Sequence, residues 1–265
     1  MLDLTSPRQS VASVVHALSI LRYLGEYGRP IGVTALAKSL GISPSSCFNL
    51  LRTLVAEGMV DFHPVTKNYT LGMGMIEISH HALAQSKIVN FLRHKLELLA
   101  DEFQMTVVLR QVSVGDRLIV IATAESSSDT QIHIRIGHRV PLLAGASGRC
   151  MAAFGKYSEE EIKKRFEQLR WYQKPMFSTY MKEIKQVRRD GWSIDQNQFR
   201  AGITTIAAPV YNESQRVTYC LTSTMFTGQH DAETLVRIGQ SVRDTAAQVS
   251  RGSYDEEISS KSVFE

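Results

Sequence analysis

The sequence is short of cysteine and of long apolar runs, and each shortage excludes classes of protein. Its three cysteines, Cys47, Cys150 and Cys220, lie far apart and form no CxxC pair, which argues against a disulfide framework and a structural zinc site. No apolar run approaches the roughly 18 residues of a membrane span, so we expect no membrane partner. The opening residues, MLDLTSPRQS, lack the basic and apolar regions of a secretory signal, and we therefore expect a cytoplasmic protein.

Motifs of nucleotide and metal chemistry are missing as well. The chain contains no G-x-G-x-x-G, no P-loop and no H-E-x-x-H, so we expect neither a cofactor nor a metal ion. The run GASG around Ser147 is not a nucleophile elbow, because that motif needs a glycine two residues after the serine and Gly148 follows directly. We therefore expect no enzyme. An esterase-like hydrolase that combines Ser147 with His133 or His138 and Asp195 remains an alternative.

The composition is that of a globular protein with buried cores. At 265 residues, with 43% hydrophobic and 21% charged residues, the chain is long enough for two domains. The formal net charge of +4 permits a polyanionic partner, but so mild an excess is common among enzymes too. The pattern of side chains therefore has to decide the function.

Three short apolar patterns at helical spacing stand near the N-terminus. They cover residues 11–24, residues 33–40 with Gly41 as a left-handed stop, and a third helix that begins after Ser43 with a first-turn proline and ends before Gly58. Two helices joined by so short a turn are typical of a helix-turn-helix. The following MVDFHPVTKNYTLG predicts a hairpin with the polar turn PVTKN, which would form a wing.

The outer face of the third helix carries small polar groups instead of the usual Lys and Glu. Such groups suit DNA, because Ser and Thr bind phosphates or base edges, Asn pairs with adenine, and Arg binds guanine or phosphate. We predict these DNA-contacting residues: Ser43, Ser45, Ser46, Phe48, Asn49, Arg52, Thr53 and, in the wing, Lys67. Residues 1–70 carry a net charge of only about +2, which favours a dimer. A protein-interaction module is the alternative.

The rest of the chain mixes helices and strands. Residues 73–85 predict a weak connector helix, residues 89–103 a stronger amphipathic one, and Gly115-Asp116 the turn of a hairpin. Further strands are predicted at IHIRIG, WSID, ITTIAAPVYN and VTYCLTSTMF. Further helices are predicted near Ala144, from Ser158 with Glu161 completing a capping box, at residues 178–189 and at residues 231–249.

Both halves resemble one known family. Residues 11–72 resemble the winged helix-turn-helix domain of the IclR family of bacterial transcription regulators, whose members typically read RALDILEAL, LTELARALGLPKSTVHRLLATLVARG and YRLG. IGHRVPLLAGASGRCMAAF resembles GxRxPLHATALGKALLA, and VRRDGWSIDQNQFRAGITTIAAPVYN resembles VRxxGYAxDxEExxxGxxCIAAPVxD. The resemblance implies an α+β protein with a winged helix-turn-helix domain at residues 8–72, a connector helix at 73–87, a GAF-like effector domain with an antiparallel sheet at 88–252, and a flexible tail at 253–265.

The resemblance also implies an effector cup. Carried over position by position, its residues are Ala146, Ser147, Asp195, Thr205, Thr222 and Thr224. Backbone N–H groups at the start of the Ala-Ser-Gly helix would face a carboxylate, and the threonines would offer hydroxyl groups. Without the likeness, Thr222 and Thr224 would read as ordinary strand residues.

This sequence departs from the family pattern at several functional positions. Phe48 and Asn49 replace the usual His and Arg, and Thr205, Arg149 and Leu143 replace the usual Cys, Lys and His. Neither the base preference nor the effector of a relative can therefore be transferred. We expect a ligand-responsive transcription regulator of a bacterial catabolic pathway that binds a double-stranded DNA operator, senses a small, hydroxylated or aromatic organic acid, and acts as a homodimer or a dimer of dimers.

Overall fold

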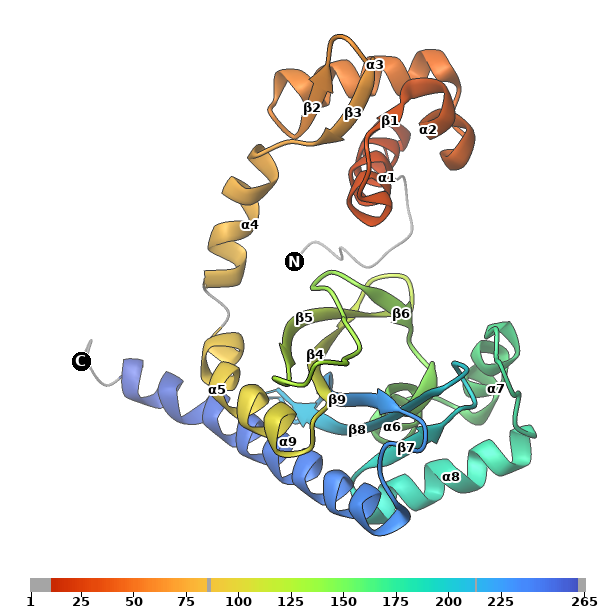
Figure 1. Cartoon of the computed structure of the whole chain (residues 1–265), viewed down its shortest axis with the longest axis vertical. Helices are drawn as coiled ribbons and strands as arrows, with labels where there is room; N and C mark the ends of the chain where they lie inside the picture. Colours follow the sequence, from red (N-terminus) through yellow and green to blue (C-terminus); the bar gives the residue numbers. More distant parts are fainter. Residues whose placement is uncertain (1–10, 85–86, 213, 262–265) are drawn as a thin grey trace. The chain divides into compact units, whose positions relative to one another are not determined.

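The structure, a computed structural model, describes residues 11–84, 87–212 and 214–261 (Figure 1). The chain divides into two compact units, Met1–Gln85 and Ser86–Glu265. The division lies inside the segment for which the sequence predicts a connector helix. In the described ranges no helix is both long and apolar enough to cross a membrane.

The N-terminal unit combines three helices and a small antiparallel sheet with a fourth helix that follows the sheet. Its helices are α1 (Ala12–Tyr27), α2 (Val33–Leu40), α3 (Pro44–Ala56) and, after the sheet, α4 (Gly74–Ala84). Its strands are β1 (Ile31–Gly32), β2 (Val60–His63) and β3 (Asn68–Leu71), arranged in the order β1-β3-β2. The core includes Ile20, Leu36, Cys47 and Leu51, each with no exposed surface. The predicted winged helix-turn-helix is confirmed.

The turn between α2 and α3 follows from its residues. Gly41 adopts φ 66° and its N–H bonds back to α2, which ends that helix in the left-handed conformation that glycine tolerates best. Ser43 then caps α3, its hydroxyl accepting the Ser46 N–H at 3.2 Å, and Pro44 occupies the first turn. Strand β1 is not predicted from the sequence, because two residues are too few to show an alternating pattern.

The C-terminal unit is built on one six-stranded antiparallel sheet of order β6-β5-β4-β9-β8-β7. The strands are β4 (Thr106–Ser113), β5 (Arg117–Glu125), β6 (Arg139–Pro141), β7 (Ser193–Gln196), β8 (Ile203–Tyr211) and β9 (Val217–Phe226). The helices are α5 (Lys87–Glu102), α6 (Gly145–Phe154), α7 (Glu159–Gln168), α8 (Phe177–Asp190) and α9 (Ala232–Lys261). The expected antiparallel sheet flanked by helices is thus confirmed.

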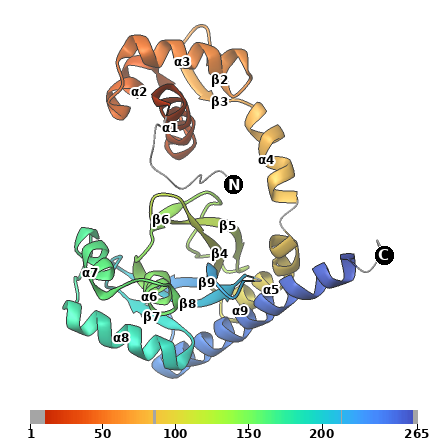
Figure 2. The same cartoon turned by 180° about the vertical axis from the view of Figure 1, so that it is seen from behind.

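Two helical layers cover the two faces of this sheet. Helices α5 and α9 lie side by side on one face, and α6 and α8 lie on the other (Figure 2). Because successive side chains of a strand point to opposite faces, Val107 and Leu109 of β4 join the core beneath α5 and α9. On the other face, Cys220 and Ala207 pack with α6. We call this α6-covered side the cup face, since it carries Thr205, Thr222 and Thr224.

Two predicted elements differ from the structure. The segment IHIRIG is not a strand: Gly137 turns the backbone at φ 86°, and Ile134 is buried against Val108 and Val120 on the cup face. The segment therefore covers the sheet instead of extending it. The last helix was expected to end near Val249, but α9 continues to Lys261. The hairpin at Gly115-Asp116 and the capping box of Ser158 and Glu161 are confirmed.

Candidate DNA interface and effector site

Helix α3 buries one face and presents the other to solvent. Cys47 and Leu51 have no exposed surface. All eight residues predicted to contact DNA are exposed: Ser43, Ser45, Ser46, Phe48, Asn49, Arg52, Thr53 and Lys67. The structure therefore leaves this face open to a partner, as base reading in a major groove requires.

The beginning of α3 is a cluster of hydroxyl groups. Ser43 Oγ donates to Ser46 Oγ at 2.8 Å and lies 3.2 Å from Ser45 Oγ. These contacts hold the three hydroxyl groups together. A helix N-terminus with clustered donors suits a phosphate oxygen.

The middle of α3 carries the longer polar side chains of its exposed face. No side chain described in the structure bonds to the amide of Asn49 or to the guanidinium of Arg52, both of which are exposed. Thr53 bonds its own helix through the Asn49 carbonyl at 3.2 Å. In the wing, Lys67 stands in the turn at φ 57°, with its Nζ 5.7 Å from the centre of the Phe62 ring. Asn49 and Arg52 are thus exposed polar groups of α3 without a partner among the described residues.

The predicted effector residues converge where α6 meets the cup face. Ser147 Oγ lies 2.9 Å from Thr222 Oγ1, and the Ala146 N–H donates to Thr205 Oγ1 at 3.3 Å. Thr205 pairs across the sheet with Thr224. Elements distant in the sequence therefore bring five of the six predicted residues together.

The sixth predicted residue, Asp195, is engaged by a buried arginine. Arg149 Nη1 donates to the Asp195 carboxylate at 2.8 Å, Arg149 Nε donates to Glu183 at 2.7 Å, and Arg149 is only 1% exposed. Arg149 also bonds the Gly145 carbonyl at 3.1 Å, and its guanidinium carbon lies 5.1 Å from the centre of the Tyr180 ring. Asp195 thus neutralises Arg149 and holds the start of α6, which leaves it less available to an effector than the threonines.

Sequence reasoning missed one charged residue on the cup face. Arg110 is only 6% exposed, and its Nε and Nη1 are buried without a hydrogen-bond partner. Thr224 Oγ1 and Thr123 Oγ1 are also buried and unpartnered. The available signal was an arginine inside the apolar strand TVVLRQVS, because a charged residue at a central strand position requires a partner.

The described contacts of Ser147 do not include a histidine. The Ser147 hydroxyl bonds Thr222, and His133 Nδ1 lies 2.6 Å from Glu125 Oε1 as an ion-pair contact. All three cysteines are buried. Within the described residues no group of three His, Cys, Asp or Glu side chains is arranged to hold a metal ion.

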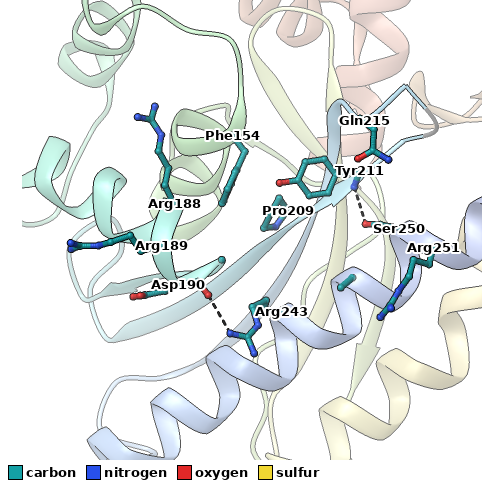
Figure 3. Close-up of a pocket in the computed structure, with 12 residues that line it drawn as sticks. Phe154, Arg188, Arg189, Asp190, Pro209, Tyr211, Gln215, Arg243, Ser250 and Arg251 are labelled. Atoms are coloured by element: carbon teal, nitrogen blue, oxygen red, sulfur yellow. Dashed lines mark hydrogen bonds between the residues drawn. The ribbon is translucent and has the colours of Figure 1, made fainter.

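A cavity of about 470 Å³ lies away from the predicted cup, between the end of α8, strand β8 and α9 (Figure 3). Four arginines line it: Arg188, Arg189, Arg243 and Arg251. Arg188 bonds the Ala153 carbonyl at 2.8 Å, and Arg243 bonds Asp244 and the Asp190 carbonyl. None of the six predicted effector residues lines this cavity.

Two family models match the chain, one for each unit. The IclR helix-turn-helix domain matches residues 13–64. The model described as Bacterial transcriptional regulator IclR C-terminal matches residues 80–251. The two matches cover both the exposed α3 face and the cup.

Individual proteins agree with these matches. The HTH-type transcriptional regulator XynR of Escherichia coli is 26% identical over 249 residues, which are 91% of this chain and 96% of XynR. An IclR transcriptional regulator from Alicyclobacillus acidocaldarius superposes with a TM-score of 0.82 at 27% identity, covering 92% of this chain and all of that one. An IclR homolog from Microbacterium hydrocarbonoxydans, complexed with 4-hydroxybenzoate, shares the fold with a TM-score of 0.70 at 15% identity, covering 89% and 99% of the two chains.

Proposed function

This chain belongs to the IclR family of bacterial transcriptional regulators, and we propose that its α3 reads an operator in duplex DNA while its C-terminal unit senses a small organic acid. The observation that carries the DNA half is the outer face of α3, where Asn49 and Arg52 are exposed and have no partner among the residues that the structure describes. The cup of Ala146, Ser147, Thr205, Thr222 and Thr224 supports the sensing half. The protein would act in the cytoplasm on a catabolic pathway.

Control of DNA by the acid follows from a shift between two arrangements. Two helix-turn-helix domains in a dimer can take more than one relative arrangement. An acid that binds one arrangement more tightly than another will raise the population of that arrangement. Asp195 takes part as a positioning residue, because Arg149 joins it to the carbonyl at the start of α6. The complex of the Microbacterium protein with 4-hydroxybenzoate supports an aromatic hydroxy acid as the first compound to test.

The helix-turn-helix domains of two copies pair through α1. Four apolar side chains at the start of α1 are exposed: Val11, Val14, Val15 and Leu18. Their spacing places them on one face of the helix. This face fits a second copy of the chain. One helix-turn-helix domain carries little positive charge, and a two-fold pair of domains matches two half-sites of an operator. We propose a homodimer, or a dimer of dimers, with α1 in its interface.

The test of the DNA half is selection of genomic fragments by the purified protein. We expect a fragment with two related half-sites, bound with an affinity that falls steeply as salt rises, because Lys and Arg displace counterions from phosphates. Arg52→Ala should weaken that binding. Arg117→Ala, which removes an exposed positive charge from β5, is the matched control. Equal binding of random duplex would defeat the proposal.

The test of the sensing half is the double replacement of Thr222 and Thr224 by Val. The change keeps the β-branched shape and removes two hydroxyl groups, so operator affinity should stay unchanged while the response to acid is lost. Ser223→Ala, in the same strand but on the opposite face of the sheet, is the control. Electrophoretic shifts with and without 4-hydroxybenzoate measure both quantities, and a double variant that still responds would remove the two threonines from the cup.

A further inference from the structure

Arg110 lies on the cup face in the middle of the sheet. It pairs with Cys220 of β9 on one side and with Val120 of β5 on the other. Val107 and Leu109 of the same strand both point into the core beneath α5 and α9. The Arg110 side chain therefore points to the opposite face, toward the residues of the cup.

No carboxylate among the described residues pairs with Arg110, and its electrostatic neighbour is the thiol of Cys220, opposite it on β9. Burial lowers the pKa of its guanidinium to about 10, so the group stays protonated at neutral pH. The acidic side chains near this layer are engaged elsewhere, Glu125 with His133 and Asp195 with Arg149. A buried, unpaired charge is strongly unfavourable, and an anion from outside the chain would remove that cost.

Arg149 differs from Arg110 in the partners of its guanidinium. Arg149 is buried as well, but two carboxylates, a backbone carbonyl and a side-chain amide surround its guanidinium. Arg149 therefore has a structural role in the C-terminal unit. Arg110 bonds no group of the described chain, and the unpartnered hydroxyls of Thr123 and Thr224 face the same side. Arg110 and the unpartnered hydroxyls of Thr123 and Thr224 thus share one face of the sheet.

We propose that Arg110 receives the carboxylate of the effector, while the threonine hydroxyls of β9 bind a second polar group on the same molecule. The inference rests on the proposed sensing function and specifies how the acid is oriented. Charge-assisted hydrogen bonds from a guanidinium to a carboxylate are among the strongest in proteins. The N-terminus of α6 is a weaker receptor, because the Ala146 N–H already donates to Thr205.

The register of the strands also defines the size of the acid. Arg110 stands opposite Cys220, so Thr222 and Thr224 lie two and four residues farther along β9. At roughly 3.3 Å per residue the offsets along the strand are about 7 and 13 Å. A monocarboxylate with a hydroxyl group at its far end spans the shorter offset, whereas a two-carbon acid does not.

The experiment measures the thermal stability of the full chain, without DNA, in the presence of matched pairs of compounds. The pairs are 4-hydroxybenzoate with 4-hydroxybenzamide and benzoate with benzamide, and glycolate is the short acid. We expect 4-hydroxybenzoate to stabilise the wild type most, its amide not at all, and glycolate little. A wild type that responds equally to acid and amide, or to none of these acids at millimolar concentration, overturns the proposal.

Arg110→Met and Arg110→Lys separate binding from structure. Arg110→Met should bind 4-hydroxybenzoate about tenfold more weakly or worse, since hydrogen bonds to charged groups contribute most, and it should be at least as resistant to denaturant without acid. Arg110→Lys should keep a preference for acid over amide. Arg117→Met, which removes an exposed charge from the neighbouring strand, should behave as wild type.

The variants also tell this inference apart from the proposed function. Arg110→Met that is less stable than wild type without acid, or that binds the acid normally, shows that Arg110 is structural and contradicts the inference. A protein that selects an operator but does not distinguish acid from amide keeps the DNA half and loses this inference. A protein that distinguishes them but selects no operator keeps the inference and loses the DNA half.

Discussion

At the scale of single residues, Asn49 carries the sharpest consequence for DNA reading. Its amide is exposed on α3 and unbonded within the described chain, so it can offer a donor and an acceptor to adenine. Asn49→Ala should cost about 1 to 3 kcal/mol of binding to the preferred operator and relax the preference at one base position. Affinities for the operator and its single-base variants measure this. An equal loss on every sequence would instead assign Asn49 to the phosphate backbone.

Arg149 is the residue whose loss should unfold the C-terminal unit most readily. Arg149→Met leaves the carboxylate of Asp195, which is only 3% exposed, without its partner. Breaking a buried pair in this way costs about 3 to 5 kcal/mol, and denaturant titration of the full chain measures it. Arg149→Lys keeps the charge and should cost less. A fully stable Arg149→Met would contradict the role of this arginine as a structural centre.

At the scale of elements, helix α6 depends on a glycine. A Cβ on Gly148 would overlap the backbone carbonyl of Leu143, so α6 packs directly on the segment that precedes it. Gly148→Ala should destabilise the protein by about 3 kcal/mol or more, because a backbone carbonyl cannot move aside as a side chain can. Chemical denaturation gives the value.

Gly115→Ala is the control for that prediction. Gly115 has φ 74° in the β4–β5 turn and open space around it, so the substitution brings conformational strain without overlap. It should cost only roughly 1 to 2 kcal/mol. If Gly148→Ala proved as mild as Gly115→Ala, the close packing of α6 against Leu143 would be wrong.

At the scale of the whole molecule, the exposed apolar face of α1 decides the assembly. Val14→Glu with Leu18→Glu places charges on that face, 55% and 43% exposed at these positions. The double variant should remain folded, shift toward monomer and lose affinity for an operator with two half-sites. Sedimentation velocity and operator binding measure the two effects. Val114→Glu, an exposed position in the β4–β5 turn, is the control, and an unchanged double variant would exclude α1 from the interface.

The sequence alone determined the two-unit α+β architecture, the helix-turn-helix and the antiparallel sheet. These depend on local signals: the period of apolar residues, Gly41 and Ser43 in the tight turn, and the Gly115-Asp116 hairpin. Such signals act between residues a few positions apart, so the chain displays them without its tertiary fold. The exposed polar face of α3 followed from the same periodicity.

Only the tertiary structure decided the charges of the cup. Asp195 was predicted to face an effector, but Arg149, 46 residues away, takes its carboxylate. IHIRIG alternates like a strand, yet it folds over the sheet where Ile134 is buried. The sequence around Arg110 does not record that its guanidinium is buried with no carboxylate beside it among the described residues. Strand register and layer packing join residues far apart in the sequence, and no local pattern records which buried charge finds a partner within the chain.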